Sequence, residues 1–316
     1  MELGRLLFYD VRLSRDSTVS CSTCHQQSRA FSDGKKLGVG INGQNTDRNT
    51  MSLVNILWSS PRKFWDGRVE SLEEQAIHPI EDPREMGLSM DKVTDRLSNI
   101  PAYRKKFKAA FNTGKIKKEH IAMALAQFQR TLISQDSKYD KFLKGEMQLS
   151  EMELRGMQSF FTHPDPSINL RGSNCGDCHR NFLTDGFSDG FDGFANNGLE
   201  DDNNLENGLF EVTGNPADKG KFTVPSLRNI ELTAPYMHDG RFNTLDEILD
   251  HYNDHIKESA TLDVLIRDAS NEARQPDDPI ALKLTDQDKQ DIIAFMLTLT
   301  DSTFITNEKY SNPFVD

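Results

Sequence analysis

The sequence has 316 residues, of which 36% are hydrophobic and 27% are charged, and this is the composition of an ordinary soluble globular protein of about two domains. No apolar run approaches the length of a transmembrane helix, so we expect no membrane span. The formal net charge of -12 argues against nucleic acid as a partner. This acidity permits docking to a basic protein, or it serves only to maintain solubility.

The string Cys-x-x-Cys-His occurs twice and contains all four cysteines of the chain. This spacing is the attachment signature of c-type haem, because two thiols bind the haem covalently and the adjacent imidazole ligates the iron. A single tetrahedral zinc could use the four thiolates, but it would leave both histidines without a role. We therefore predict two covalently bound haem c groups. Their attachment points and iron ligands are Cys21, Cys24 and His25 for the first haem, and Cys175, Cys178 and His179 for the second.

The chain opens at Met1-Glu2-Leu3-Gly4, without the basic region and apolar stretch of a signal peptide. Covalent haem attachment normally takes place outside the cytoplasm. We therefore expect a periplasmic protein whose export signal is not part of this sequence.

The residues that precede the two haem strings resemble each other. Gly4-Arg5-Leu6-Leu7-Phe8-Tyr9 precedes the first string and Gly156-Met157-Gln158-Ser159-Phe160-Phe161 precedes the second, and both read as a helix that ends shortly before a haem. Further matches lie downstream, where residues 52–56 and 66–68 pair with 226–230 and 239–241. Two homologous haem domains explain these matches.

The polar stretch between Leu143 and Ser150 places the domain boundary near residue 145, which gives domains of residues 1–145 and 146–316. Strand signals are few. Apolar periodicity predicts helices over residues 89–99, 118–134, 150–161, 244–256 and 285–298, so the fold is mostly α. The stretch between His179 and Val224, which includes residues 185–190, is rich in Gly, Asn and Asp and predicts a long loop that serves as a solvated connector or has a function.

Both halves continue into a helix opened by a capping box, Ser71-Leu72-Glu73-Glu74 in the first and Thr244-Leu245-Asp246-Glu247 in the second. The apolar stripe of the second helix ends in Tyr252. The equivalent stripe of the first helix contains Gln75 and Pro79, and the ring of Pro79 cannot ligate iron.

This difference predicts two unlike irons. The second iron can be six-coordinate, with His179 and Tyr252 as ligands, while the first keeps an open site above His25. Tyr252 could instead be an ordinary core tyrosine, with His251 or His255 as the ligand of the second iron. His78 is the candidate that would close the first iron.

Several motifs together resemble the bacterial dihaem cytochrome c peroxidase and MauG superfamily. They are the two haem strings, Phe64-Trp65-Asp66-Gly67-Arg68, the run from Val224 to Asn229, and the run from Ala234 to Gly240. The resemblance extends from Gly4 to about Leu299. It implies an all-α fold of two cytochrome c-like haem domains in tandem with long loops, with an open peroxidatic haem in the first and a six-coordinate haem in the second.

Within that superfamily, typical peroxidases have a methionine ligand on the second haem and a histidine in the loop after the first. This chain has Tyr252 at the first of these positions, and it has no histidine between His25 and His78. Both departures resemble MauG, whose second haem is ligated by histidine and tyrosine and whose first haem is five-coordinate.

The resemblance also assigns roles to individual residues. Glu85 and Gln75 match the family's distal carboxylate and amide, and Trp65 matches the indole between the haems. His238 resembles a family histidine near the second haem, where we expect hydrogen bonding and not ligation. From the sequence alone, Glu85 would be a surface residue and Trp65 a core residue.

The family further places one Ca²⁺ between the domains. The matching ligands here are the side chain of Asn49 and the backbone carbonyls of Thr233 and Pro235, and oxygen ligands of this kind suit a hard cation.

Three functions follow from these features. The first is a periplasmic dihaem cytochrome c peroxidase-type oxidoreductase that reduces hydrogen peroxide at the N-terminal haem, while the C-terminal haem relays or stores oxidising equivalents. Its electrons would come from a small donor protein, a cytochrome c or a cupredoxin. The second is a MauG-like oxidase that modifies side chains of a partner protein. The third is a dihaem electron-transfer cytochrome.

Overall fold

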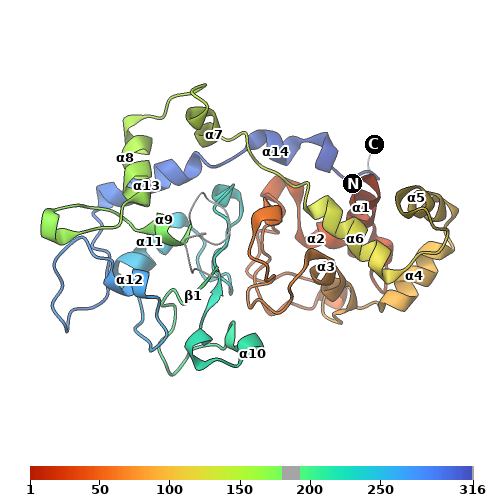
Figure 1. Ribbon diagram of the computed structural model, residues 1–316, viewed down its shortest axis with the longest axis horizontal. Coiled ribbons are helices and arrows are strands. Elements are labelled where there is room, and N and C mark those ends of the chain that lie inside the picture. The colour runs from red at the N-terminus through yellow and green to blue at the C-terminus, as the bar shows by residue number, and fades with distance from the viewer. Residues whose placement is uncertain (180–192, 315–316) are drawn as a thin grey trace.

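The computed structural model describes residues 1–179 and 193–314, and within these ranges the chain is mostly helical (Figure 1). The first half contains α1 (Glu2–Tyr9), α2 (Cys21–Cys24), α3 (Leu72–Glu81), α4 (Met90–Ser98), α5 (Pro101–Phe111) and α6 (Lys118–Gln129). The second half contains α7 (Lys138–Leu143), α8 (Glu151–Phe161), α9 (Cys175–Cys178), α10 (Phe210–Thr213), α11 (Leu245–Asp254), α12 (Val264–Asp268), α13 (Asp286–Leu297) and α14 (Ser302–Thr306).

The five helices predicted from periodicity are present as α4, α6, α8, α11 and α13, although α6 ends at Gln129 and not at residue 134 as predicted. Both predicted N-caps form, but the predicted reciprocal capping box is complete only at α11 and not at α3. Ser71 accepts a hydrogen bond from the backbone N–H of Glu74 at the start of α3, and Thr244 and Glu247 form a reciprocal capping box at the start of α11. The side chains satisfy backbone N–H groups that have no partner within the helix, which fixes where α3 and α11 begin.

Strand structure among the described residues is limited to one two-stranded antiparallel sheet. It pairs β1 (Phe194–Ala195) with β2 (Phe222–Thr223), with Phe194 opposite Thr223. The predicted long loop therefore contains this small sheet and α10 in its described part. Residues 185–190 of that loop lie outside the described residues.

The described residues build two hydrophobic cores. The first is formed mainly by residues between Leu3 and Leu132, and the second by residues between Tyr139 and Leu299. The most extensive helix pairing in the first half is α1 with α6, and in the second half it is α8 with α13. The division into two cytochrome c-like domains at residue 145 stays a prediction, with which these two cores are compatible.

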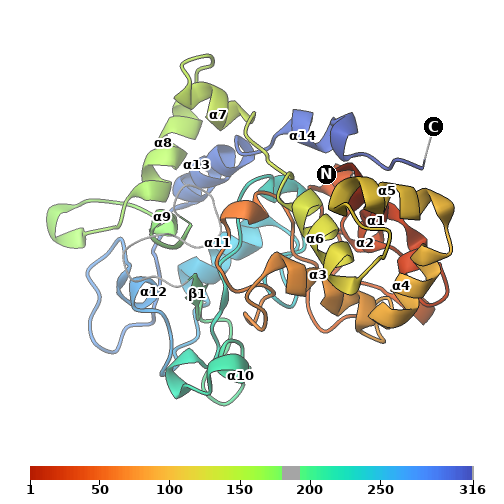
Figure 2. The same cartoon turned by 45° about the vertical axis from the view of Figure 1, so that its right-hand side comes forward.

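The C-terminal segment returns to the first half. Figures 1 and 2 show α14 running from the end of α13 towards the N-terminal helix α1. Phe304 and Tyr310 of this segment are buried in the first core, and the Tyr9 hydroxyl donates a hydrogen bond to the backbone carbonyl of Tyr310 (2.7 Å). The last part of the chain therefore ties the two halves together.

Candidate haem sites

The first haem string lies on the short helix α2, and His25 follows it directly. The His25 Nδ1 atom is 2.8 Å from the backbone carbonyl oxygen of Phe31. Because a carbonyl only accepts hydrogen bonds, Nδ1 carries the proton and Nε2 has the lone pair that an iron ligand needs. Burial lowers the pKa of His25, which keeps the ring neutral, as metal ligation requires.

The second haem string repeats this arrangement on α9. The His179 Nδ1 atom is 3.0 Å from the backbone carbonyl oxygen of Pro225, and burial lowers the pKa of His179 to about 4. None of the four cysteines forms a disulfide bond. Each string thus offers two thiols and a neutral, oriented imidazole, a set of donors that fits covalently attached haem.

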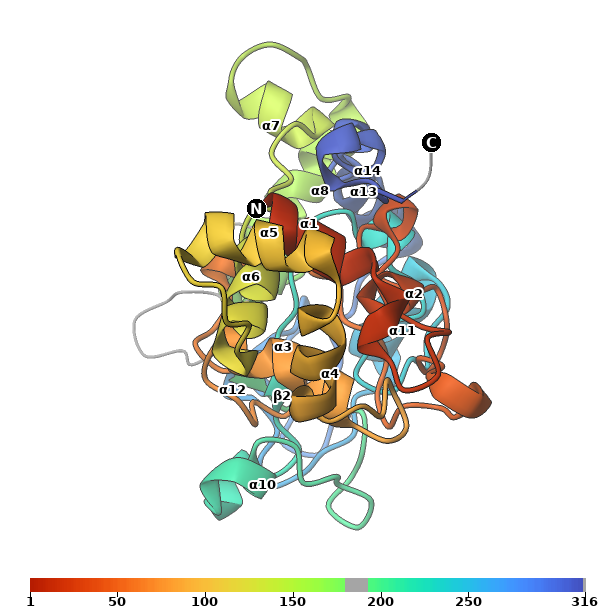
Figure 3. The same cartoon turned by 90° about the vertical axis from the view of Figure 1, so that its right-hand side faces the viewer.

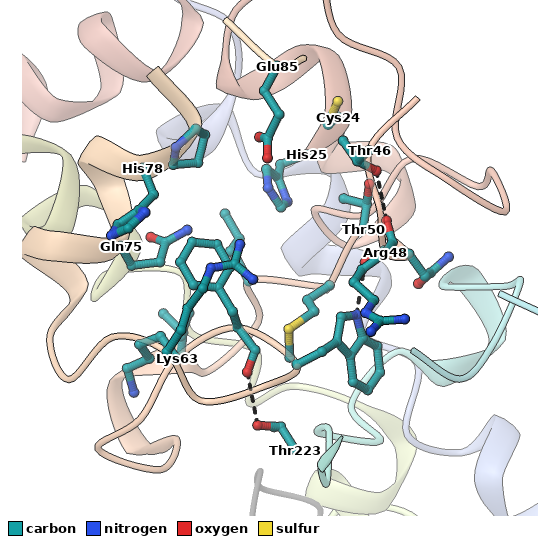
Figure 4. A pocket seen from close by; sticks show the side chains of 18 of the residues that line it. Cys24, His25, Thr46, Arg48, Thr50, Lys63, Gln75, His78, Glu85 and Thr223 are labelled. Carbon is teal, nitrogen blue, oxygen red and sulfur yellow. Dashed lines mark hydrogen bonds between the residues drawn. The ribbon is translucent and has the colours of Figure 1, made fainter. Parts of the chain in front are cut away.

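A cavity of about 490 Å³ adjoins the first string, within the size range of cofactor pockets (Figure 4). Cys24 and His25 line it from the haem string, and Gln75, Pro79 and Glu85 line it from α3 and the turn after it. Figure 4 shows the Glu85 carboxylate and the His25 ring directed into the same space. The structure therefore brings together the residues that the sequence assigned to the first haem and to peroxide.

Gln75 has an unusual environment. Its Oε1 atom is buried and makes no hydrogen bond to any of the described residues. An unpaired buried acceptor is costly, so this atom suits a group that a bound substrate would satisfy. Pro79 lies one helical turn further along α3 and lines the same cavity, where its ring cannot ligate a metal.

Glu85 follows α3 in a turn that other backbone groups hold in place. Its carbonyl accepts a hydrogen bond from the backbone N–H of Ile41 (2.8 Å), in the loop that has no histidine. Burial raises the pKa of the Glu85 carboxyl to about 7, and Asp82 acts in the same direction. A carboxyl group of this pKa can both accept and return a proton near neutral pH.

His78 lies at the edge of this cavity. It is exposed, and its ring makes an edge contact with Phe64 at 5.8 Å between centroids. Its role as a sixth ligand of the first iron stays a prediction.

Trp65 lies between the two halves. It is 8% exposed, and its indole N–H donates a hydrogen bond to the backbone carbonyl of Asn49 (2.9 Å). Its own carbonyl accepts a hydrogen bond from the backbone N–H of Thr223 (2.9 Å), and its ring centroid is 6.5 Å from that of His238. The indole thus contacts groups from both halves, and its role as an electron relay stays a prediction.

A charged cluster that the sequence analysis did not identify surrounds His238. The imidazole is stacked on Phe222 (3.7 Å between centroids), and its Nε2 atom is 3.0 Å from the carboxylate of Glu206. Glu206 also pairs with Arg48 of the first half (2.5 Å), and these contacts lower the pKa of Glu206 to about 2. Arg48 and Glu206 are far apart in the sequence and belong to no motif, so only the fold reveals them.

Tyr252 lies on α11 beside the second haem string. It is partly buried against the second core, and Cys175 packs against the same core. Burial raises the pKa of Tyr252, so a phenolate forms here only with a cation beside it. Ligation of the second iron by Tyr252 stays a prediction.

The two competing histidines are engaged elsewhere. His251 is 4% exposed, and its Nε2 atom is 2.9 Å from the backbone carbonyl oxygen of Asn197. His255 is exposed, with its Nδ1 atom 3.0 Å from the carbonyl oxygen of Asp250. The choice of Tyr252 over these two histidines as the ligand of the second iron stays a prediction.

Comparison with known proteins agrees with this geometry. The family model described as di-haem cytochrome c peroxidase matches residues 1–148. The methylamine utilization protein MauG of Methylorubrum extorquens is 34% identical over 298 residues, which cover 94% of this chain and 77% of that protein. The chain belongs to the dihaem cytochrome c peroxidase and MauG family.

Two further members of the family show the same likeness. The cytochrome c551 peroxidase of Nitrosomonas europaea is 36% identical over 253 residues, which cover 79% of this chain and 71% of the relative. The crystal structure of a MauG-like protein associated with microbial copper homeostasis superposes with a TM-score of 0.82 at 36% identity, covering 99% of this chain and 93% of that chain.

Membership in the dihaem cytochrome c peroxidase and MauG family implies two haem cofactors, in agreement with the two attachment strings. The predicted family and the predicted class of enzyme, a peroxidase-type oxidoreductase, are confirmed. Among residues 1–179 and 193–314, no helix has the length and apolar character needed to cross a membrane.

Two of the three predicted Ca²⁺ ligands, Asn49 and Thr233, form hydrogen bonds with nearby backbone. The Asn49 Nδ2 atom donates a hydrogen bond to the carbonyl of Lys35 (2.9 Å), and its backbone N–H donates one to the carbonyl of His238 (2.9 Å). The hydroxyl of Thr233 donates to the carbonyl of Ile230 (3.2 Å), and Pro235 follows two residues later. Asn49 therefore joins the two halves, and its Ca²⁺ ligation stays a prediction.

Proposed function

We propose that the chain is a periplasmic dihaem peroxidase that reduces hydrogen peroxide at its N-terminal haem. The observation that carries this proposal is the meeting of His25, Gln75 and Glu85 in one cavity. When bound, the haem supplies the iron at which peroxide binds and the electrons that begin its reduction.

Glu85 is the proposed general base and acid. Its carboxylate takes the proton from one oxygen of hydrogen peroxide and returns it to the other, so that cleavage of the O–O bond releases water. Two electrons and two protons in total convert hydrogen peroxide into two water molecules. The raised pKa of Glu85 suits this exchange at neutral pH.

Gln75 is the proposed positioning group. Its unpaired Oε1 atom can accept a hydrogen bond from the peroxide O–H, and its amide N–H can donate one to an oxygen. Both contacts orient the substrate without adding charge to the cavity. Pro79, one turn further along the same helix, places a ring that cannot ligate a metal at its own position in the cavity wall.

Trp65 and Tyr252 would extend the reaction to the second half. The indole of Trp65 offers an aromatic route for electrons between the two haem sites. Tyr252 offers the second iron an anionic oxygen in place of a neutral thioether, and this favours the higher oxidation states of iron over the lower ones. The second site would then hold or relay oxidising equivalents that arise at the first.

The tyrosine also favours a second candidate function. A site that holds oxidising equivalents suits a MauG-like oxidase, which would withdraw electrons from side chains of a partner protein. The likeness to MauG over 94% of the chain supports this alternative. A dihaem electron carrier, the third prediction, has no need for Glu85 or for the unpaired amide oxygen of Gln75.

Steady-state turnover with hydrogen peroxide and a reduced small cytochrome c or cupredoxin tests the proposal. We expect rapid turnover that is lost in Glu85→Gln. Slow turnover, combined with oxidation of protein side chains, would favour the MauG-like function. Turnover that is unchanged in Glu85→Gln would contradict the assigned role of Glu85.

A further inference from the structure

A second glutamine beside the first haem site has no role in the proposed function. Gln129 is the last residue of α6, and only 4% of it is exposed. Its Oε1 atom is buried and makes no hydrogen bond to any residue that the structure describes, the same condition as that of Gln75. Because buried polar groups in proteins nearly always have a hydrogen-bond partner, this unpaired amide oxygen favours a small bound molecule as its partner.

The structure holds Gln129 and Gln75 on neighbouring helices. Figures 2 and 3 show α6 beside α3, and the two helices pack against each other. The guanidinium of Arg130 donates two hydrogen bonds to the carboxylate of Glu73, at 2.7 and 2.9 Å. Arg130 directly follows Gln129, and Glu73 lies two residues before Gln75. This two-point contact therefore fixes how α6 sits on α3 next to both glutamines.

Both glutamines line a small cavity that adjoins the larger one. The small cavity has a volume of about 50 Å³ and shares Cys24, His25, Gln75 and Glu85 with the larger cavity. A buried water molecule needs about 10–15 Å³ and two to four polar partners, and the small cavity offers both. Its other walls are mainly apolar and include Phe8, Val19, Ala76, Met86 and Leu125.

The polar groups of the small cavity suit a water molecule. Gln75 and Gln129 contribute neutral amides, whose hydrogen bonds fit a neutral molecule that both donates and accepts. Water can donate one hydrogen bond to Gln129 Oε1 and one to the Glu85 carboxyl, and it can accept one from the amide N–H of Gln75. These three contacts leave Gln75 its Oε1 atom and its second N–H for hydrogen peroxide.

The amide of Gln75 needs an anchor of this kind. The last torsion of a glutamine side chain is broad, so a free amide presents either its oxygen or its nitrogen to the same point. We propose that Gln129 is a positioning residue of the peroxide site, which holds an ordered water molecule against Gln75 and thereby fixes the orientation of that amide. This proposal rests on the proposed function, since that function gives Gln75 its role in binding peroxide.

Infrared spectroscopy of carbon monoxide on the reduced, haem-loaded protein tests this role without peroxide or turnover. Carbon monoxide binds an open ferrous haem, and its stretching frequency falls when a hydrogen-bond donor approaches its oxygen. The test variant is Gln129→Met, which keeps the length of the side chain and removes its amide, and Gln129→Leu repeats the test with a different shape. Gln127→Met is the control, because it makes the same change at an exposed position of α6.

Gln75→Leu completes the design, alone and combined with Gln129→Met. If Gln129 acts through Gln75, the effects of the two substitutions are not additive. We expect a broader carbon monoxide band at higher frequency in Gln129→Met and Gln129→Leu than in the wild type and Gln127→Met. In the Gln75→Leu background, Gln129→Met should cause no further shift.

An unchanged band in both Gln129 variants would overturn the proposal, and so would an equal shift in the presence and absence of Gln75. Failure of carbon monoxide to bind would overturn it together with the open first iron. Loss of peroxide turnover alongside the expected infrared shifts would count against the proposed function and support the role of Gln129.

A crystal structure of the haem-loaded protein tests the water itself. We expect a water molecule within about 3 Å of both Gln129 Oε1 and the amide nitrogen of Gln75. Haem atoms or a protein side chain in that position would overturn the proposal.

Discussion

A carboxyl group and a carboxamide define the proposed peroxide site at the scale of single residues. Burial raises the pKa of the Glu85 carboxyl to about 7, and Gln75 presents an oxygen that no described residue satisfies. Glu85 belongs to no local pattern, since a lone Glu in a sequence reads as surface, whereas Gln75 lies on the stripe of its helix that matches the stripe ending in Tyr252. Only the resemblance to the dihaem family assigned their roles, and the cavity gives that assignment its physical basis.

The first prediction concerns Glu85 and pH. Its carboxylate must be ionised to take the peroxide proton, so the rate of the peroxide reaction should rise as the pH increases through about 7 and then level off. Glu85→Gln should lower this rate about 100-fold or more and abolish its pH dependence. Stopped-flow absorbance of the haem bands measures the rate. Glu74→Gln, an exposed residue that lines the same cavity, should keep the wild-type profile.

The second prediction concerns Gln75. Gln75→Leu removes a buried, unpaired oxygen, so the free energy of unfolding should increase by about 1 kcal/mol while the peroxide reaction slows. Chemical denaturation and stopped-flow kinetics measure the two effects. Gln44→Leu, at an exposed position, should change neither quantity. A Gln75→Leu protein that is both less stable and fully active would show that the amide serves only the structure.

At the scale of helices, the internal sequence repeat appears as two equivalent helix crossings. Gly4 of α1 faces the backbone carbonyl of Ala124 on α6, and Gly156 of α8 faces that of Asp291 on α13. A Cβ atom at either glycine would lie within 2 Å of that carbonyl oxygen, so each crossing requires glycine. Gly4 and Gly156 occupy equivalent positions in the sequence repeat, each in the helix that precedes a haem string. The sequence predicted the helices and their caps because both depend on local patterns, whereas partners such as α6 and α13 are set by packing.

The third prediction tests these crossings. Gly156→Ala should lower the free energy of unfolding by about 1–3 kcal/mol, because the two helix backbones must separate to admit the methyl group. Gly114→Ala is the matched control, since a Cβ atom there has nothing within 4 Å. Thermal unfolding of both variants measures the difference. Equal stability of the two would mean that α8 and α13 adjust without cost.

At the scale of the whole molecule, the two halves are joined by contacts between residues that belong to no sequence motif. Arg48 of the first half pairs with Glu206 of the second, which in turn holds His238. Phe304 and Tyr310 return to the first core. Sequence reasoning located the haem strings and Trp65, but residues that act only through distant partners carry no local signal, and so Arg48 and Glu206 were missed.

The fourth prediction concerns Ca²⁺ between the halves. A cation that binds only the folded protein raises its stability, so a chelator should lower the melting temperature of the haem-loaded protein by about 5 °C. Asn49→Ala should remove this sensitivity to the chelator, whereas Asn45→Ala, at an exposed position of the same loop, should retain it. An equal response of all three proteins to the chelator would exclude Asn49 as a ligand.

The unlike coordination of the two irons is the central claim, and low-temperature electron paramagnetic resonance of the oxidised haem-loaded protein tests it most directly, alongside the variant Tyr252→Met. We predict one high-spin ferric haem and one low-spin ferric haem, with only the low-spin signal altered in the variant. Two low-spin signals, with neither affected by Tyr252→Met, would contradict the account and would show that residues such as His78 and His251 close the irons instead.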